Sequence, residues 1–301
     1  MKKLATLGYL LVMTAAVGSA QRLHRPAIIG ISHVTLRSAN LKRSQQFYGG
    51  VLGFPKEAAG NRPDALRFRI NRQQYIEVVA TDDKADRLFE IGFQTTDAEQ
   101  LRRYLAEEGI EVPGRVEAGA DGSRSFYVRD PEGHELSFVQ EPSARPVGGP
   151  DSEHQQISTQ MIHAGFIVRD RAEEDHFYKD VLGFHVYWHG GMKNGQTDWV
   201  DMQVPDGTDW LEYMLNVEAN PSPREAGVMR HLALGVTDIK PAVKLVKQRG
   251  WPMPEKAQVG LDGKWQLNLY DPDLTRVEVM GFQPVRRPCC APYTGPHPVP
   301  R

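Results

Sequence analysis

The residues best suited to chemistry are histidines and glutamates that stand inside apolar runs. His33 and His163 each follow a short apolar segment, and Glu212 and Glu278 each occupy the middle of a strand-like run. A glutamate that is buried in a strand is costly unless it has a partner. A metal ion is one such partner, and an arginine such as Arg276 is the alternative.

Imidazole and carboxylate together suit divalent iron, manganese, nickel, cobalt or zinc. Two histidines and one carboxylate on one face of a metal leave open positions for a substrate and for oxygen. A metal held in this way chelates two neighbouring oxygens of a substrate and acts as a Lewis acid. The residue types therefore indicate metal-dependent chemistry on a small oxygen-bearing molecule.

Both histidine-bearing runs open a longer repeat. Residues 47–54 read FYGGVLGF and residues 177–184 read FYKDVLGF, so these eight-residue blocks agree at six positions. Each block follows its histidine at nearly the same distance. A repeat of this length indicates duplicated structural units.

Hydrophobic periodicity and turn residues predict four such units, each with the order βαβββ. Asn40 is a suitable N-cap for the first helix, and Gly53 is suited to follow its end. The predicted helices cover residues 41–51, 97–108, 173–181 and 239–249. The predicted strands cover residues 29–36, 65–70, 74–79, 88–95, 123–128, 135–140, 161–168, 197–203, 209–215, 230–236, 264–269 and 275–281.

Composition favours an ordinary globular protein that acts on a small molecule. The chain has 301 residues, of which 40% are hydrophobic and 25% charged, and its net charge is −2. Neither a nucleic acid nor an anionic membrane is an expected partner at this charge. A small-molecule substrate is the expected partner, and a homodimer is left open.

Both ends of the chain differ from its centre. Residues 1–20 combine a basic start with an apolar run and small residues, which predicts a signal peptide cleaved after Ala20 and a secreted or periplasmic protein without a membrane anchor.

Residues 284–301 form a Pro-rich tail that is predicted to be poorly ordered. Cys289 and Cys290 lie in it, and because adjacent cysteines rarely pair with each other without strain, no structural disulfide is expected inside the core.

The repeated block after a histidine-bearing strand, with an Asp-Pro turn before a Glu-bearing strand, resembles the vicinal oxygen chelate superfamily. Its members include glyoxalase I, the fosfomycin and bleomycin resistance proteins, extradiol dioxygenases and 4-hydroxyphenylpyruvate dioxygenase. The resemblance covers about residues 28–283. It implies an α+β fold in which four βαβββ modules pair into two domains, each a curved mixed-sheet half-barrel pair.

A Pro-, Gly- and polar-rich linker at residues 142–156 divides the modules into an N-terminal domain, residues 28–141, and a C-terminal domain, residues 157–283. The family pattern carries metal ligands on the first and last strands of each module. In the C-terminal domain the resemblance places them at His163, Glu212, His231 and Glu278. Each histidine stands seven residues before an aspartate, which supports this register.

The N-terminal domain matches the same pattern less well. The four positions fall on His33, Glu77, Glu90 and Ser137. Serine is a poor ligand beside carboxylates. Glu135 lies two residues earlier on the same face of the strand and stays an alternative. We therefore expect a degenerate copy with an impaired or absent metal site.

Among reaction types, the resemblance favours a secreted iron(II)-dependent dioxygenase of extradiol type. In that reading His163, His231 and Glu278 hold the metal, and Glu212 is a fourth ligand or a catalytic base. The substrate is then a small, oxygen-chelating and preferably aromatic molecule. One departure is Asn268, which stands where the extradiol fingerprint has a tyrosine.

Two alternatives remain from the same residues. A glyoxalase-like lyase or isomerase would use all four ligands with zinc, nickel or manganese. A binding or resistance protein would sequester its ligand without turnover. The cavity of any of these would draw on the tryptophans of the C-terminal half. His185 and His189 are predicted as surface or loop histidines, and residues 189–195 as a mobile loop over the site.

Overall fold

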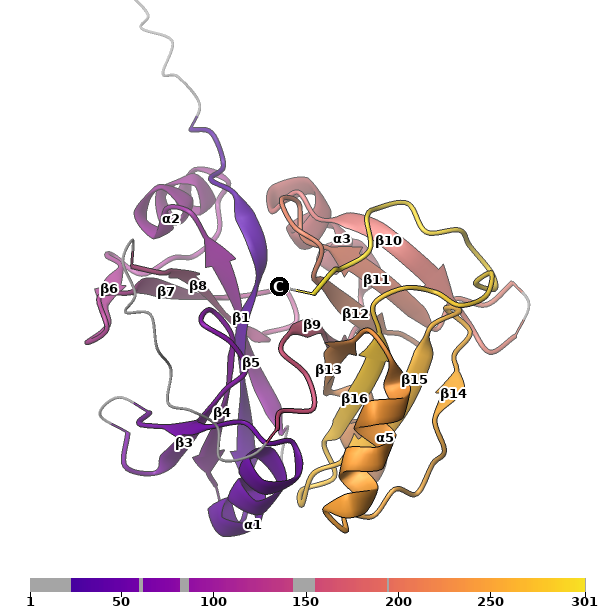
Figure 1. Ribbon diagram of the computed structural model, residues 1–301. Helices are drawn as coiled ribbons and strands as arrows, with labels where there is room; N and C mark the ends of the chain where they lie inside the picture. Colours follow the sequence, from indigo (N-terminus) through magenta and orange to yellow (C-terminus); the bar gives the residue numbers. More distant parts are fainter. Residues whose placement is uncertain (1–22, 60–61, 82–86, 143–154, 194, 301) are drawn as a thin grey trace, which may run out of the picture.

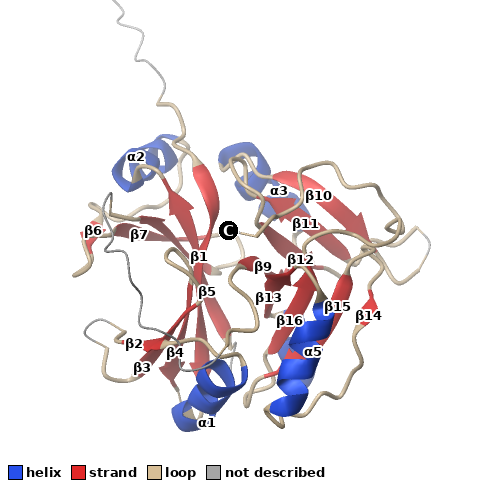
Figure 2. Cartoon of the chain, in the orientation of Figure 1, coloured by secondary structure: helices blue, strands red, loops and turns tan. Residues whose placement is uncertain are grey.

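A computed structural model describes residues 23–59, 62–81, 87–142, 155–193 and 195–300 (Figure 1). The predicted signal peptide and residues 143–154 of the predicted linker lie outside these ranges. Two sheets make up most of the molecule, and in Figure 2 the helices lie at the periphery of these sheets. No helix among the described residues combines the length and apolar character needed to cross a membrane.

The N-terminal sheet has eight strands in the order β2-β3-β4-β1-β5-β8-β7-β6. Its strands are β1 (Ile28–Ser38), β2 (Lys56–Glu57), β3 (Ala65–Arg69), β4 (Tyr75–Ala80), β5 (Leu88–Thr95), β6 (Glu117–Ala118), β7 (Arg124–Arg129) and β8 (Glu135–Gln140).

The C-terminal sheet repeats this order as β10-β11-β12-β9-β13-β16-β15-β14. Its strands are β9 (Met161–Ile167), β10 (His185–Gly190), β11 (Trp199–Gln203), β12 (Trp210–Met214), β13 (His231–Val236), β14 (Gln258–Val259), β15 (Trp265–Tyr270) and β16 (Arg276–Gly281).

Each sheet joins two modules through the antiparallel pairing of their first strands, β1 with β5 and β9 with β13. Within a module the first strand runs parallel to the last, as β9 does to β12. The predicted α+β fold of paired modules in mixed sheets is thereby confirmed. Periodicity missed β2, β6 and β14 because two residues are too few to show alternation, and it also missed the longer β10.

The repeated blocks form helices of mixed type. α1 (Leu41–Gln45) continues as a π-helix over Gln46–Val51, and α3 (Arg171–Asp175) continues likewise over His176–Val181. The glycine near the end of each block, Gly53 or Gly183, follows the π-helix and has a φ of 79°, a left-handed conformation that glycine adopts without strain.

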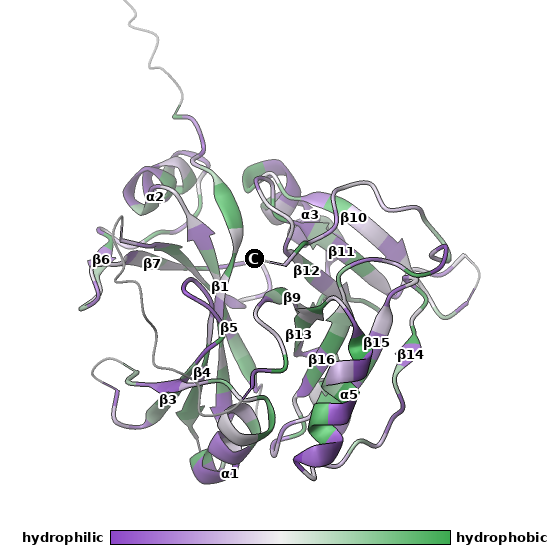
Figure 3. Ribbon diagram, in the orientation of Figure 1, coloured by the Kyte–Doolittle hydropathy of each residue, from purple (hydrophilic) through white to green (hydrophobic). Residues whose placement is uncertain are grey.

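The other helices are α2 (Ala98–Glu107), α4 (Pro223–Met229) and α5 (Ile239–Gln248). Periodicity had not predicted α4. Along α5 green and purple bands alternate in Figure 3, and the helix buries Ile239, Ala242 and Val246. This amphipathic pattern is what packs α5 against β15 and β16 of its own sheet.

Each repeated block binds the opposite domain across the domain boundary. Tyr48, from the first block, donates a hydrogen bond to Asp271 Oδ2 at 2.9 Å, and Tyr178, from the second, donates to Asp130 Oδ2 at 3.1 Å. Each aspartate opens the Asp-Pro turn of the opposite domain, and all four residues are buried. The block therefore joins the domains in addition to building each module.

The C-terminal tail packs on the protein, so the prediction of a poorly ordered segment is wrong. The backbone N–H of Thr294 donates to Tyr187 O in the edge strand β10 at 3.0 Å, and Tyr293 donates to Asp262 O at 2.8 Å. An edge strand offers unpaired backbone groups. The tail satisfies some of them, a tertiary contact that composition cannot reveal.

The expectation about the cysteines is also wrong. Cys289 and Cys290 form a disulfide between adjacent residues. The N–H of Cys289 donates to Leu261 O at 2.8 Å, and its carbonyl accepts from Trp188 Nε1 at 3.3 Å. The cysteine pair is thus held against the C-terminal sheet.

Candidate metal centre

Four neighbouring central strands of the C-terminal sheet carry the predicted ligands. His163 lies on β9, Glu212 on β12, His231 on β13 and Glu278 on β16. Both histidines are fully buried and Glu278 is 3% exposed, whereas Glu212 is only half-buried. Residues far apart in the sequence thus meet because the two modules pair through β9 and β13.

Three of these side chains converge on one point. The Nε2 atoms of His163 and His231 are 3.1 Å apart, and His163 Nε2 lies 3.5 Å from Glu278 Oε2. The ligand atoms of all three residues lie within 4.8 Å of one another. This spacing suits donors that share one cation.

The protonation of the two histidines supports the same conclusion. Burial lowers the pKa of His163 well below its ordinary value and also lowers that of His231. The Nδ1 atom of His231 faces the carbonyl of Met229 at 3.2 Å, which assigns its proton there and leaves Nε2 as an acceptor. This acceptor faces both His163 Nε2 and the guanidinium of Arg276. The donor set therefore fits a divalent metal ion.

Space for the His231 ring comes from a glycine that sequence reasoning missed. Gly165 on β9 is the register partner of His231 on β13. A Cβ atom at Gly165 would lie far inside van der Waals distance of the His231 ring. The only available hint was a glycine in a strand, two residues after His163.

Glu212 lies beside the convergent group and not within it. Its Oε2 atom is 2.9 Å from His231 Nε2, and the guanidinium of Arg276 donates to that nitrogen at 2.8 Å. Arg276 also lies 3.8 Å from Glu212 Oε2. His163, His231 and Glu278 therefore form a triad, with Glu212 and Arg276 along one side.

Negative charge accumulates around this triad. Asp201, which sequence reasoning missed, faces Glu212 in register on β11 and is 4% exposed, and its Oδ1 atom has no hydrogen-bond partner in the part of the chain that the structure describes. Burial and then Glu212 raise the pKa of Asp201 well above its ordinary value. Burial also raises the pKa of Glu278 to about 8. A bound cation would compensate this excess of buried carboxylates.

A cavity of about 400 Å³ adjoins the triad. Aromatic and apolar side chains share its wall with the polar groups described above. The lining residues are His163, Trp188, Met192, Trp199, Asp201, Trp210, Glu212, Gln258, Val259, Gly260, Leu261, Asp262, Gln266, Arg276, Glu278 and Met280. A volume and a wall of this kind suit a small, planar, partly polar molecule.

In the N-terminal sheet, the side chains at the positions equivalent to the triad form hydrogen bonds with one another. Glu90 lies 3.0 Å from His33 Nε2 and accepts from Ser137 and Thr35, each at 2.8 Å. Burial alone would raise the pKa of Glu90, but His33 and these hydrogen bonds lower it to about 2. Within the described ranges, no third ligand-type side chain converges on His33 and Glu90.

The other two N-terminal candidates are held by arginines. Glu77 accepts from Arg67 at 2.8 Å and from Arg62 at 3.2 Å. Glu135 is partly exposed and lies 3.8 Å from Arg129. Both carboxylates thus have the arginine partner that was the alternative to a metal.

The histidines that were predicted as surface or loop residues lie in a strand. His185 and His189 both belong to β10, where His185 contacts Gln203 Oε1 at 3.1 Å and His189 is exposed. Neither lines the cavity. Their neighbour Trp188 does, with its side chain buried against the sheet.

The sequence matches the family model described as the Glyoxalase/Bleomycin resistance protein/Dioxygenase superfamily over residues 30–138 and 160–279. The chain belongs to this superfamily, in agreement with the resemblance noted from its repeated motifs. No curated protein matches the chain by sequence.

Solved structures with the same fold include three bacterial dioxygenases. The 2,3-dioxygenase LapB from Pseudomonas sp. KL28 has a TM-score of 0.67 at 17% identity, over 92% of this chain and 96% of that one. An extradiol ring-cleaving dioxygenase from B. fuscum has a TM-score of 0.65 at 16% identity, over 86% and 73%. Homoprotocatechuate 2,3-dioxygenase from Brevibacterium fuscum, in complex with 3,4-dihydroxyphenylacetate, has a TM-score of 0.62 at 17% identity, over 86% and 82%.

Proposed function

We propose that this protein is a metal-dependent enzyme of the superfamily with iron(II)-dependent, extradiol-type dioxygenase chemistry. The observation that carries the proposal is the convergence of His163, His231 and Glu278 within 4.8 Å. Two histidines and one carboxylate are the ligands of many non-haem iron(II) oxygenases. The dioxygenases that share this fold support the same choice.

The proposed substrate is a small aromatic molecule with two adjacent oxygens. When bound, iron(II) supplies open positions at which such oxygens and dioxygen can be activated together. Trp188 and Trp199 in the cavity wall would orient an aromatic ring. Arg276 lines the same cavity and attracts an anionic substrate oxygen, while Glu212 beside it accepts the proton that the substrate hydroxyl loses.

The test is the metal content of protein purified without oxygen, for the wild type and for Glu278→Ala. Stoichiometric iron in the wild type and its loss in the variant support the proposal, and oxygen uptake is then measured with catecholic substrates. Glu218→Ala, which alters an exposed glutamate, is the matched control and keeps its metal. A protein that neither holds nor rebinds metal would be a binding protein instead.

A second candidate is glyoxalase-type lyase or isomerase chemistry with zinc, nickel or manganese. The 2.9 Å distance from Glu212 Oε2 to His231 Nε2 favours it, because a fourth ligand then stands beside the triad. Glu212→Gln separates the two candidates. A triad enzyme keeps its iron in this variant, whereas a four-ligand site loses much of its affinity for the metal.

Export is proposed on the basis of the N-terminal sequence. Residues 1–20 have the basic, apolar and small-residue order of a cleaved leader. Mass spectrometry of the protein from the periplasmic or culture fraction should give an N-terminus at Gln21. A full-length protein that stays in the cytoplasm contradicts this proposal.

A further inference from the structure

A second group of metal-ligating side chains lies at the domain boundary, away from the candidate centre. Asp130 and His134 belong to the turn between β7 and β8 of the N-terminal domain, and Glu174 belongs to α3 of the C-terminal domain. We propose that these three residues bind a divalent metal ion that links the two domains. The chemical class of ligand is a borderline cation such as zinc or manganese.

The geometry is that of three donors around one position. His134 Nδ1 lies 2.7 Å from Asp130 Oδ2, and one carboxylate oxygen of Glu174 completes a group whose ligand atoms lie within 4.8 Å of one another. One imidazole and two carboxylates suit zinc or manganese, with water in the remaining positions. Tyr178 donates to Asp130 Oδ2 and orients that carboxylate.

The environment of the Glu174 carboxylate independently indicates a cation at this position. Its side chain is fully buried, and only its Oε1 atom has a partner, the backbone N–H of Glu132 at 3.1 Å. The buried Oε2 atom has no hydrogen-bond partner among the described residues. A buried carboxylate oxygen without a donor is strongly disfavoured. A metal ion shared with His134 and Asp130 would satisfy it.

The internal repeat offers a natural control for this site. Across the other half of the boundary, Tyr48 contacts Asp271 as Tyr178 contacts Asp130. There Ser44 holds the helix position of Glu174, and Thr275 holds the turn position of His134. The fold therefore needs neither a glutamate nor a histidine here. The metal-ligating pair is specific to one of two equivalent contacts.

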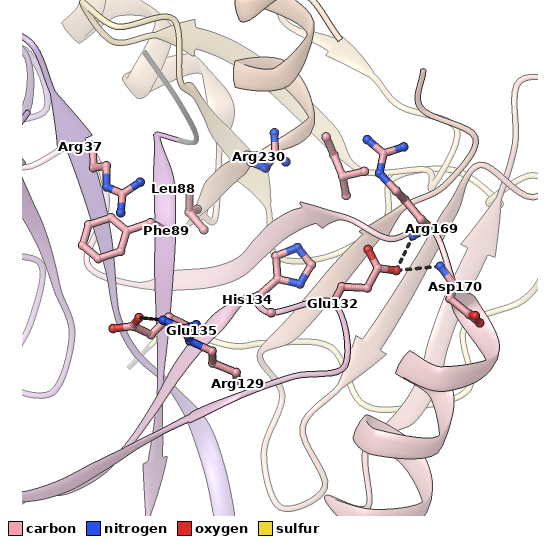
Figure 4. Close-up of a pocket in the computed structure, with 12 residues that line it drawn as sticks. Arg37, Leu88, Phe89, Arg129, Glu132, His134, Glu135, Arg169, Asp170 and Arg230 are labelled. Carbon is pink, nitrogen blue, oxygen red and sulfur yellow. Dashed lines mark hydrogen bonds and ion pairs between the residues drawn. The ribbon is translucent and has the colours of Figure 1, made fainter. Parts of the chain in front are cut away.

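One of the three ligands, His134, is reachable from solvent. His134 forms part of the wall of an interdomain cavity of about 570 Å³. Figure 4 shows its imidazole between Glu132 on one side and Phe89 with Arg37 on the other. Glu132 accepts from the backbone N–H groups of Arg169 and Asp170 and so holds the turn against α3. A hydrated ion can therefore approach the imidazole from this cavity.

The test counts zinc ions bound to the full chain after metal removal, by equilibrium dialysis, in four proteins. The wild type should bind two ions, Glu174→Gln one, His231→Ala one, and the double variant none. Glu173→Gln changes the neighbouring exposed glutamate of α3 and should bind as many ions as the wild type. Near-ultraviolet circular dichroism establishes that each variant is folded, and His134→Ala replaces Glu174→Gln if the latter is not.

The outcomes separate this site from the proposed function. If the wild type binds one ion that His231→Ala loses and Glu174→Gln keeps, the interdomain site is refuted and the triad stands. If the single ion is lost in Glu174→Gln and kept in His231→Ala, the interdomain site stands and the triad fails. Zinc should also raise the unfolding temperature of His231→Ala but not of the double variant.

Discussion

The two sheets place the same positions at their centres but fill them differently. In the N-terminal sheet, Thr35 faces Glu90 in register and donates a hydrogen bond to it. In the C-terminal sheet, Gly165 faces His231 at the equivalent position and leaves room for its ring. One pair makes an internal hydrogen bond, and the other makes room for an imidazole whose Nε2 atom faces His163 and Arg276.

A second pair of positions shows the same contrast in charge. Arg67 faces Glu77 in the N-terminal sheet and pairs with it, whereas Asp201 faces Glu212 in the C-terminal sheet. The first carboxylate is neutralised by the protein itself. The second carboxylate faces another acid in register, and Arg276 lies 3.8 Å from it on the side of the triad. The shared fold is thus compatible with either a closed polar network or a cation site.

The largest expected difference between the two sheets appears when one histidine is removed from each. We expect His231→Ala to abolish metal binding at the triad and to lower activity by about a hundredfold or more, because a ligand matters more than the residues that support it. His33→Ala should keep the metal and activity but lower the free energy of unfolding by about 3 kcal/mol, since it leaves Glu90 buried without its histidine.

Metal analysis, turnover and denaturant unfolding of the two variants check this prediction. The fold of His231→Ala should survive. Loss of the catalytic metal and of activity in His33→Ala, with both retained in His231→Ala, would mean that the catalytic half has been assigned wrongly.

A second test converts the centre of the N-terminal sheet into a copy of the C-terminal triad. Thr35→Gly, Glu90→His and Ser137→Glu together restore two histidines, one glutamate and the glycine that makes room for a ring. This triple variant should bind one more metal ion than the wild type by equilibrium dialysis. The variant without Thr35→Gly is the control and should not bind it, because Thr35 occupies the space of the new ring.

A smaller difference concerns acid stability. The pKa of Glu90 is lowered from 4.5 to about 2 in the folded protein. Its stabilising contribution is therefore complete above about pH 4.5 and is lost as the pH falls towards 2. We expect this loss to be on the order of 2–3 kcal/mol and to be absent in Glu90→Gln.

Urea unfolding between pH 5 and pH 2 measures this effect, with Glu111→Gln at an exposed position as the control. Equal acid sensitivity in the wild type and Glu90→Gln would show that the ionised Glu90 carboxylate does not stabilise the folded protein through the N-terminal network.

The smallest expected effect tests the symmetry of the domain contacts. Tyr48→Phe and Tyr178→Phe each remove one buried hydroxyl that donates to an aspartate of the opposite domain. Each should lower the free energy of unfolding by about 1–2 kcal/mol in metal-free protein. Thermal unfolding of the two variants side by side would show whether one contact carries nearly all of the effect, which would contradict the symmetry.

Much of the fold follows from the sequence because the repeat, the helix caps and the alternating strands are local signals. The blocks at residues 47–54 and 177–184 indicate duplicated modules before any coordinates are known. The helices begin after side-chain caps such as Asn40 and Asp97, as such residues predict. The candidate ligands could be named because the family resemblance marks the first and last strand of each module, and the internal register supports those positions.

The tertiary structure decided which of those candidates meet. Glu212 has the same residue type and strand context as Glu278, yet only Glu278 joins the convergent group. The tail and the adjacent cysteines were mispredicted because their partners lie on β10 and near Leu261, far away in the sequence. Local pattern determines elements and their repetition. Convergence, burial and charge depend on the register between distant strands, which a single sequence does not display.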